Sequence, residues 1–156
     1  MTTACPLCEK TADPNQLSEL VWEFPLSVAV LGEWQQYRGY CVLLLRKHGA
    51  ELSELSEQDR RQFLDDMSLT AQAIERAFRP RKMNYEMLGN QVPHMHWHLI
   101  PRYPDDPDAR QPIWGPVERA GADAVLADRL RGEPSLRRET IERVRRQLQE
   151  LTSQRA

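Results

Sequence analysis

Three of the four histidines in this 156-residue chain fall within five positions, as His94, His96 and His98. Side chains alternate between the two faces of a strand, so in an extended segment these imidazoles project to one side, about 6–7 Å apart. A neutral imidazole has an ordinary pKa of about 6.5, and its free ring nitrogen can attack phosphorus or bind a metal. Met95 and Trp97 then project to the opposite, apolar side. Because histidine has no special strand preference, the pattern favours a functional row over three unrelated surface residues.

A second group of potential ligands lies near the N-terminus, where Cys5 and Cys8 form a C-x-x-C pair. This spacing is typical of two thiolates on a tetrahedral zinc, and it also occurs in redox dithiols. The redox interpretation is weaker because four residues, rather than a strand, precede the pair. Zinc needs two more ligands, and His48 with one end of the imidazole row can supply them. Cys41 lies in an apolar segment and is expected to be a small core residue.

The elements that must hold these side chains mix strands and helices without a repeating strand–helix–strand order. Segments rich in β-branched and aliphatic residues predict strands at 21–31, 40–46, 83–88 and 94–100. Five prolines within residues 101–116 predict an extended irregular loop. This order favours an α+β domain with an antiparallel sheet.

Two amphipathic helices are expected, one after the second strand and one near the C-terminus. Ser56, with Asp59 three residues later, resembles a capping box, and Pro80 should end the first helix. Ser135 is expected to cap the second helix, whose five arginines should lie on a solvated face with some ion pairing. The apolar stripes comprise Phe63, Met67, Ala71, Ile74 and Phe78 in the first helix and Ile141, Val144, Leu148 and Leu151 in the second.

Composition excludes several classes of protein. The chain length fits one domain, and 21 Lys and Arg against 23 Asp and Glu give a net charge of −2, which argues against a strongly basic nucleic-acid binder. The longest apolar run, 40–45, is far shorter than the roughly 20 residues of a membrane span. The first residues lack the pattern of a signal peptide, and three cysteines are too few for a disulfide framework. A cytoplasmic protein is therefore expected.

Residues 93–103, PHMHWHLIPRY, resemble the signature of the histidine triad (HIT) family. The resemblance extends from the CPLC that begins at Cys5 through the RGYCVLLLRKHGAELSEL segment to Tyr103, about two-thirds of the chain. It implies an α+β domain at 1–104 with a HIT-like antiparallel sheet and a main helix. Residues 105–156 would add a proline-rich loop and a C-terminal helical extension packed on the same domain. HIT proteins are commonly homodimers that bind nucleotides and act as nucleotide hydrolases or nucleotidyl transferases.

The resemblance also implies roles for the histidines. The middle residue of the triad, His96, would be the nucleophile that attacks the α-phosphate of a nucleotide, and His98 would hydrogen-bond near the leaving oxygen. The zinc-bearing branch of the family implies a structural zinc held by Cys5, Cys8, His48 and His94.

One departure concerns the second strand, where related hydrolases carry a histidine just after a glycine and this chain has Gly39-Tyr40. We hypothesise that zinc on His94 performs the orienting task of the absent histidine by supporting His96.

The expected function is hydrolysis at the α-phosphate of a dinucleoside polyphosphate or nucleoside phosphoramidate through a nucleotidyl-histidine intermediate. A transferase or phosphorylase, and a zinc-stabilised nucleotide-binding module without turnover, are the alternatives.

Asn90 and Gln91, just before the triad, are candidate substrate contacts, and Arg102 is a weaker one. Trp114 is expected to close over the nucleotide or to pack in a subunit interface. Val28, Val30 and Leu43 are expected walls of the nucleotide slot.

Overall fold

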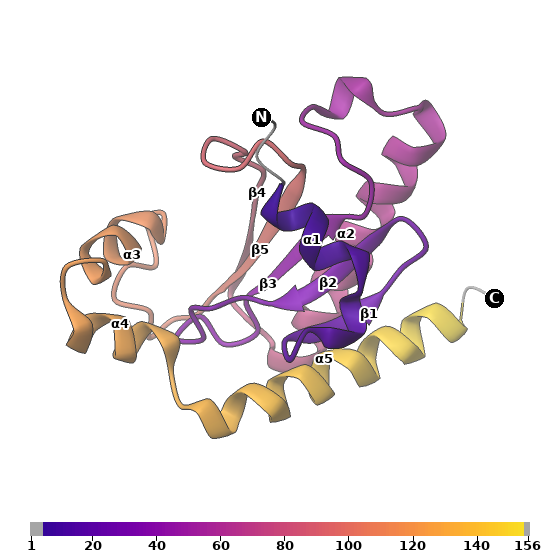
Figure 1. Ribbon diagram of the computed structural model, residues 1–156. Coiled ribbons are helices and arrows are strands. Elements are labelled where there is room, and N and C mark those ends of the chain that lie inside the picture. The colour runs from indigo at the N-terminus through magenta and orange to yellow at the C-terminus, as the bar shows by residue number, and fades with distance from the viewer. Residues whose placement is uncertain (1–4, 155–156) are drawn as a thin grey trace.

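The computed structural model describes residues 5–154 and is built on one five-stranded antiparallel sheet (Figure 1). The strands lie in the order β1-β2-β3-β5-β4. Their bounds are Leu20–Glu23 (β1), Ser27–Leu31 (β2), Cys41–Leu45 (β3), Lys82–Glu86 (β4) and His96–Arg102 (β5). The α+β class with an antiparallel HIT-like sheet is therefore confirmed.

Five α-helices and two short 3-10 helices complete the described part of the chain. The α-helices are α1 (Pro6–Ala12), α2 (Glu57–Phe78), α3 (Trp114–Ala120), α4 (Ala124–Arg131) and α5 (Pro134–Ser153), and the 3-10 helices are η1 (Pro14–Gln16) and η2 (Leu52–Glu54). Figure 1 shows α5 running along one side of the domain, with α3 and α4 near the N-terminal end of α5. Among residues 5–154, no helix combines the length and apolarity that a membrane crossing requires.

The two faces of the sheet have different surroundings. Cys41, Leu43 and Leu45 of β3 are buried in the main core with residues of α2 and α5, as expected for Cys41. Val42 and Leu44 lie on the other face, paired with His98 and His96 of β5 respectively. Because side chains alternate along each strand, this register places the two histidines on the face that the core does not fill.

Helix α2 forms as the sequence predicts. The Ser56 hydroxyl accepts a hydrogen bond from the Asp59 amide at 3.1 Å, and the helix ends at Phe78, before Pro80. Four residues of its apolar stripe are buried in the core, namely Phe63, Ala71, Ile74 and Phe78. The fifth, Met67, is partly buried and packs against the same core. The stripe fixes α2 on the face opposite His96 and His98.

Helix α5 buries its expected stripe in the same core, but its arginines contribute more than a solvated face. Arg145 donates hydrogen bonds to the carbonyls of Leu20 and Val21 on edge strand β1, and the Arg143 guanidinium lies 4.4 Å from the centre of the Phe78 ring. The expected ion pairing is present between Arg143 and a glutamate one turn earlier, at 3.6 Å. These side chains attach the helix to the sheet and to α2.

Several predicted boundaries were wrong. Residues 21–31 form two strands, because Pro25 lies in a turn in which the Phe24 amide donates to the Ser27 carbonyl at 2.9 Å. Strand β5 begins at His96 rather than at residue 94, and it continues to Arg102, while α3 begins at Trp114 inside the predicted loop. Helix α5 starts at Pro134 with Glu133 as its N-cap, so Ser135 is not the cap.

Candidate functional site

Four potential metal ligands from three separate segments meet at one end of the sheet. The Sγ atoms of Cys5 and Cys8 and one ring nitrogen each of His48 and His94 all lie within 4.8 Å of one another. The Nδ1 atom of His94 is 3.4 Å from both sulfur atoms, and that of His48 is 3.4 Å from Cys8 Sγ. The structure thus brings together all four ligands that the resemblance implied.

Backbone hydrogen bonds hold these segments together. The Met95 amide donates to the Gly49 carbonyl at 2.8 Å, and the Leu45 amide donates to the Met95 carbonyl at 3.1 Å. The loop that carries His48 is thereby attached to the residue after His94. Thr11 of α1 donates from its hydroxyl to the Arg46 carbonyl at 3.2 Å, which fixes the helix of the cysteines against the end of β3.

The chemistry of this donor set fits a tetrahedral zinc. With Zn–S about 2.3 Å and Zn–N about 2.0–2.1 Å, tetrahedral ligand atoms lie roughly 3.3–3.8 Å apart, and the three N···S distances of 3.4 Å fall in this range. The Nε2 atom of His94 is 2.7 Å from the Leu45 carbonyl, which can only accept, so Nε2 carries the proton and Nδ1 offers its lone pair to a metal. Burial lowers the pKa of His94, the hydrogen bond to the Leu45 carbonyl offsets part of this effect, and the nearby His48 and His96 lower the pKa further, so the neutral ring is favoured. The cluster can therefore hold a metal such as zinc.

The Cys5 thiol lies at the N-terminal end of α1. Burial raises its pKa, but hydrogen bonds from the backbone N–H groups of Cys8 and Leu7 outweigh that effect and lower it. A lowered thiol pKa favours the thiolate, which is the form that binds metals.

The other two triad histidines face a cavity of about 810 Å³. The ring centres of His96 and His98 are 4.8 Å apart, with the rings nearly perpendicular. His96 Nδ1 lies 2.6 Å from the carbonyl oxygen of His94, so Nδ1 carries the proton and Nε2 keeps a free lone pair. The prediction that all three imidazoles share one side was therefore wrong for His94, which precedes β5 and whose ring faces the cysteines, whereas His96 and His98 face the cavity. Met95 and Leu99 are buried and Trp97 is partly buried, on the core side as expected.

His98 has two aromatic neighbours. Its Nδ1 atom lies 2.7 Å from the Tyr40 hydroxyl oxygen, and its ring centre is 4.9 Å from that of Trp114. Burial, with a smaller effect of His96, lowers the pKa of His98 to about 4. His98 is therefore a neutral imidazole near pH 7.

The walls of the cavity come from α1, from the loop before β5 and from α3 as well as from the sheet. Asn90 and Gln91 line it and are exposed, and Val30 lines it as expected. Leu43 was wrongly predicted as a wall, because its position in β3 points it into the main core, and Val28 is not among the lining residues. The further lining side chains that sequence reasoning missed include Leu7, Lys10, Val42, Leu44, Val117 and Glu118.

Trp114, the first residue of α3, belongs to this cavity. Its indole Nε1–H donates to a Glu86 carboxylate oxygen at 2.5 Å, which holds the ring over β4 and β5. Arg102, by contrast, is buried and engaged with Asp106 at 2.6 Å and with Asn84 at 3.1 Å, so it is a structural residue of the loop and not a phosphate contact.

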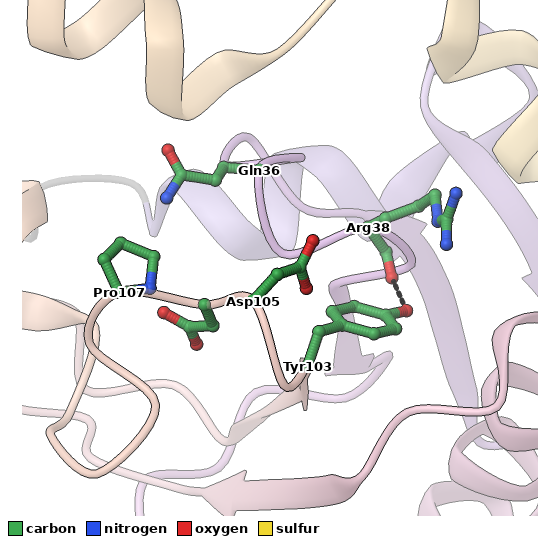
Figure 2. Close-up of a pocket in the computed structure, with 6 residues that line it drawn as sticks. Gln36, Arg38, Tyr103, Asp105 and Pro107 are labelled. Atoms are coloured by element: carbon green, nitrogen blue, oxygen red, sulfur yellow. Dashed lines mark hydrogen bonds between the residues drawn. The ribbon is translucent and has the colours of Figure 1, made fainter.

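A second cavity, of about 270 Å³, lies between the loop of Gln36 and Arg38 and the loop of Tyr103 to Pro107 (Figure 2). The Tyr103 hydroxyl donates to the Arg38 carbonyl at 2.6 Å, and the Arg38 guanidinium points away from Asp105. No histidine or cysteine lines this cavity. The candidate site is therefore the larger cavity.

Comparisons with known proteins agree with this geometry. The HIT domain model matches residues 13–105. An uncharacterized HIT-like protein of Methanocaldococcus jannaschii is 23% identical over 115 residues, which cover 71% of this chain and 88% of the relative. Among solved structures, a histidine triad protein from Bradyrhizobium japonicum is similar with a TM-score of 0.68 and 23% identity, covering 83% of this chain and 89% of that one.

A hypothetical histidine triad nucleotide-binding protein from Sulfolobus tokodaii has a TM-score of 0.69 and 18% identity, covering 94% of this chain and 93% of its own. At these identities the two structures support the fold alone. The family model covers more than half of the chain and includes the triad strand. This chain belongs to the HIT family.

Proposed function

We propose that this protein is a nucleotide hydrolase that acts at the α-phosphate through a covalent intermediate on His96. In the first step, His96 Nε2 forms a bond to the α-phosphorus while the bond from phosphorus to the leaving oxygen or nitrogen breaks. The leaving group departs with that electron pair. In the second step, a water oxygen bonds to phosphorus, the N–P bond breaks with its electron pair returning to Nε2, and a water proton passes to solvent. Two easier displacements replace one difficult displacement.

The observation that carries this proposal is the hydrogen bond of His96 Nδ1 to the His94 carbonyl. It leaves Nε2 as the nucleophilic nitrogen of a ring that lines the large cavity. When Nε2 bonds to phosphorus the ring becomes cationic, and the carbonyl dipole on Nδ1–H stabilises that charge. The nucleotide-binding description of the Sulfolobus tokodaii structure is consistent with this substrate class.

Asn90 and Gln91 are proposed to bind the phosphate. Both line the cavity together with His96 and His98, and both are exposed, so their amide N–H groups are available to a ligand. Phosphoryl oxygens need hydrogen-bond donors of this kind.

We propose that the metal is a structural zinc on Cys5, Cys8, His48 and His94. When bound, zinc would cross-link α1, the loop after β3 and the residue before β5, and it would supply folding free energy. His94 then links the two sites, since its ring would bind the metal while its carbonyl orients His96.

Trapping the intermediate tests this function. The protein is mixed with a dinucleoside polyphosphate or a nucleoside phosphoramidate labelled at the α-phosphorus, then quenched and analysed for an acid-labile nucleotidyl-histidine. We expect the label on His96 in the parent and none in His96→Asn. Binding without a label or turnover would contradict the hydrolase and indicate a binding module. A nucleoside diphosphate formed only when phosphate is added would instead indicate a phosphorylase.

We further propose a cytoplasmic homodimer that pairs through the β4 edge. Strand β4 has β5 on one side only, and Tyr85 and Leu88 are 43% and 49% exposed there, whereas Arg145 covers the β1 edge. Sedimentation should show a dimer that Tyr85→Glu dissociates. Val125→Glu, at a position on α4 that is 81% exposed, is the matched control and should leave the dimer intact.

A further inference from the structure

The Tyr40 side chain is built into the sheet beneath the catalytic cavity. Tyr40 precedes β3, is only 3% exposed and does not line the cavity. Its carbonyl accepts hydrogen bonds from the Gly32 amide at 2.8 Å and from the Gln35 side chain at 2.9 Å. A Cβ atom on Gly32 would lie 2.4 Å from the Tyr40 ring, so only glycine there leaves room for the ring. The hydroxyl is thereby held 2.7 Å from His98 Nδ1.

The position of the protons follows from what each atom can do. Burial raises the pKa of Tyr40 far above its usual value, so the phenol keeps its proton near pH 7. Among the described residues, His98 Nδ1 is the only hydrogen-bond partner of the Tyr40 hydroxyl. If Nδ1 carried the ring proton, the buried phenol proton would lack an acceptor, which is costly. The hydroxyl therefore donates to Nδ1, and the proton of the neutral His98 ring sits on Nε2.

We propose that Tyr40 is a positioning residue that fixes His98 in its Nε2–H tautomer and so gives the cavity a hydrogen-bond donor beside the free Nε2 lone pair of His96. This inference rests on the proposed function. The two neighbouring imidazoles then have complementary tasks. His96 presents a lone pair to phosphorus, and His98 presents an N–H group to the leaving atom or a phosphoryl oxygen. Trp114 contacts the His98 ring at 4.9 Å between centres and limits its rotation.

Tyr40→Phe tests this assignment because it removes the hydroxyl alone. Tyr37→Phe is the matched control, since Tyr37 is 1% exposed and its hydroxyl has no hydrogen-bond partner within residues 5–154. Long-range ¹⁵N–¹H spectra of the metal-loaded protein without substrate should show His98 protonated on Nε2 in the parent and in Tyr37→Phe. In Tyr40→Phe we expect a mixture of both tautomers. A parent with His98 protonated on Nδ1, or an unchanged tautomer in Tyr40→Phe, overturns the proposal.

Kinetics provide the second readout. Hydrogen bonds that orient metal-bound histidines contribute about 10- to 100-fold to activity, and we expect a loss of similar size when this orienting bond is removed. We expect that loss in kcat for Tyr40→Phe, with KM within about threefold of the parent because Tyr40 does not reach the cavity. An unchanged kcat overturns the positioning role. If the parent turns over no nucleotide, the proposed hydrolase fails, while the tautomer spectra still decide what Tyr40 does.

Discussion

The candidate metal cluster and the proposed catalytic cavity contain histidines that are two residues apart along the chain, and the two sites use the imidazole in opposite ways. The carbonyl of Leu45 faces Nε2 of His94, whereas the carbonyl of His94 faces Nδ1 of His96. Each carbonyl accepts a hydrogen bond from the ring N–H that it faces, so the lone pair is on Nδ1 in His94 and on Nε2 in His96. The backbone, and not the residue type, therefore decides which imidazole suits a metal and which suits a nucleophile.

The two regions also differ in what removal of a residue should do. The cluster joins three segments that are far apart in sequence, and its loss should lower stability. The cavity residues His96 and His98 lie on a strand that the core already holds, and their loss should lower turnover. The predictions below separate these effects.

The largest effect is expected for His96→Asn. Without the nucleophile, kcat should fall at least about 1,000-fold, which is a rise of about 4 kcal/mol in the barrier. The melting temperature of the metal-loaded protein should stay within a few degrees of the parent, because the ring lines an open cavity. Steady-state kinetics and calorimetry on the same samples measure both. Comparable turnover in the variant would place the nucleophile elsewhere.

Loss of the metal should act mainly on stability. At free zinc of about 1,000 times Kd, binding stabilises the folded state by about 4 kcal/mol, and chelation or Cys8→Ser should remove that amount. Denaturant unfolding with and without chelator measures it. Cys41→Ser is a control for thiol loss outside the cluster, and its zinc content should match the parent. Turnover should also fall in metal-free protein that remains folded, because His94 orients His96; equal turnover would rule out that link.

The pattern of residue types was sufficient to predict much of this arrangement. Strand alternation predicted all three triad histidines on one face, which is correct for His96 and His98 and wrong for His94. The C-x-x-C spacing indicated the two cysteine ligands, and the family resemblance added His48 and His94. The helical stripe predicted the buried face of α2. The alternation, the cysteine spacing and the stripe each depend on local periodicity, which is legible in a sequence.

Other features depend on contacts that no local pattern encodes. The Tyr40 hydroxyl is hydrogen-bonded to His98, which is 58 residues away in the sequence, and Trp114 is hydrogen-bonded to Glu86, which is 28 residues away. The buried ion pair of Arg102 with Asp106 orders a loop that its prolines had suggested was irregular. The position of His94 outside β5 follows from the Leu45 carbonyl, which is 49 residues away. The family resemblance did point to Tyr40, at the position of the expected histidine, but nothing in the sequence indicated that its hydroxyl would contact His98.

The low pKa of His98 predicts a dependence of stability on pH. Burial, with a smaller effect of His96, holds its folded-state pKa at about 4, whereas the unfolded value is about 6.5. Between these values the unfolded state binds the proton more readily, so the free energy of unfolding is highest above pH 6.5 and decreases as the pH falls toward 4. The contribution is at most about 3 kcal/mol. Subtracting the pH profile of His98→Gln from that of the parent isolates it, and a flat difference would contradict it.

The smallest effect is expected for Trp114→Phe, which tests whether α3 belongs to the cavity. The change removes the indole N–H that donates to Glu86 and leaves an aromatic ring near His98. A lost hydrogen bond of about 0.5–1.5 kcal/mol would raise KM roughly 2- to 12-fold. Trp34→Phe makes the same replacement at a tryptophan that does not line the cavity, so its KM should match the parent. Zinc content should be unchanged in both variants, because neither residue contacts the cluster. If KM shifts equally in the two variants, the indole of Trp114 has no special part in binding, and the cavity ends at the sheet.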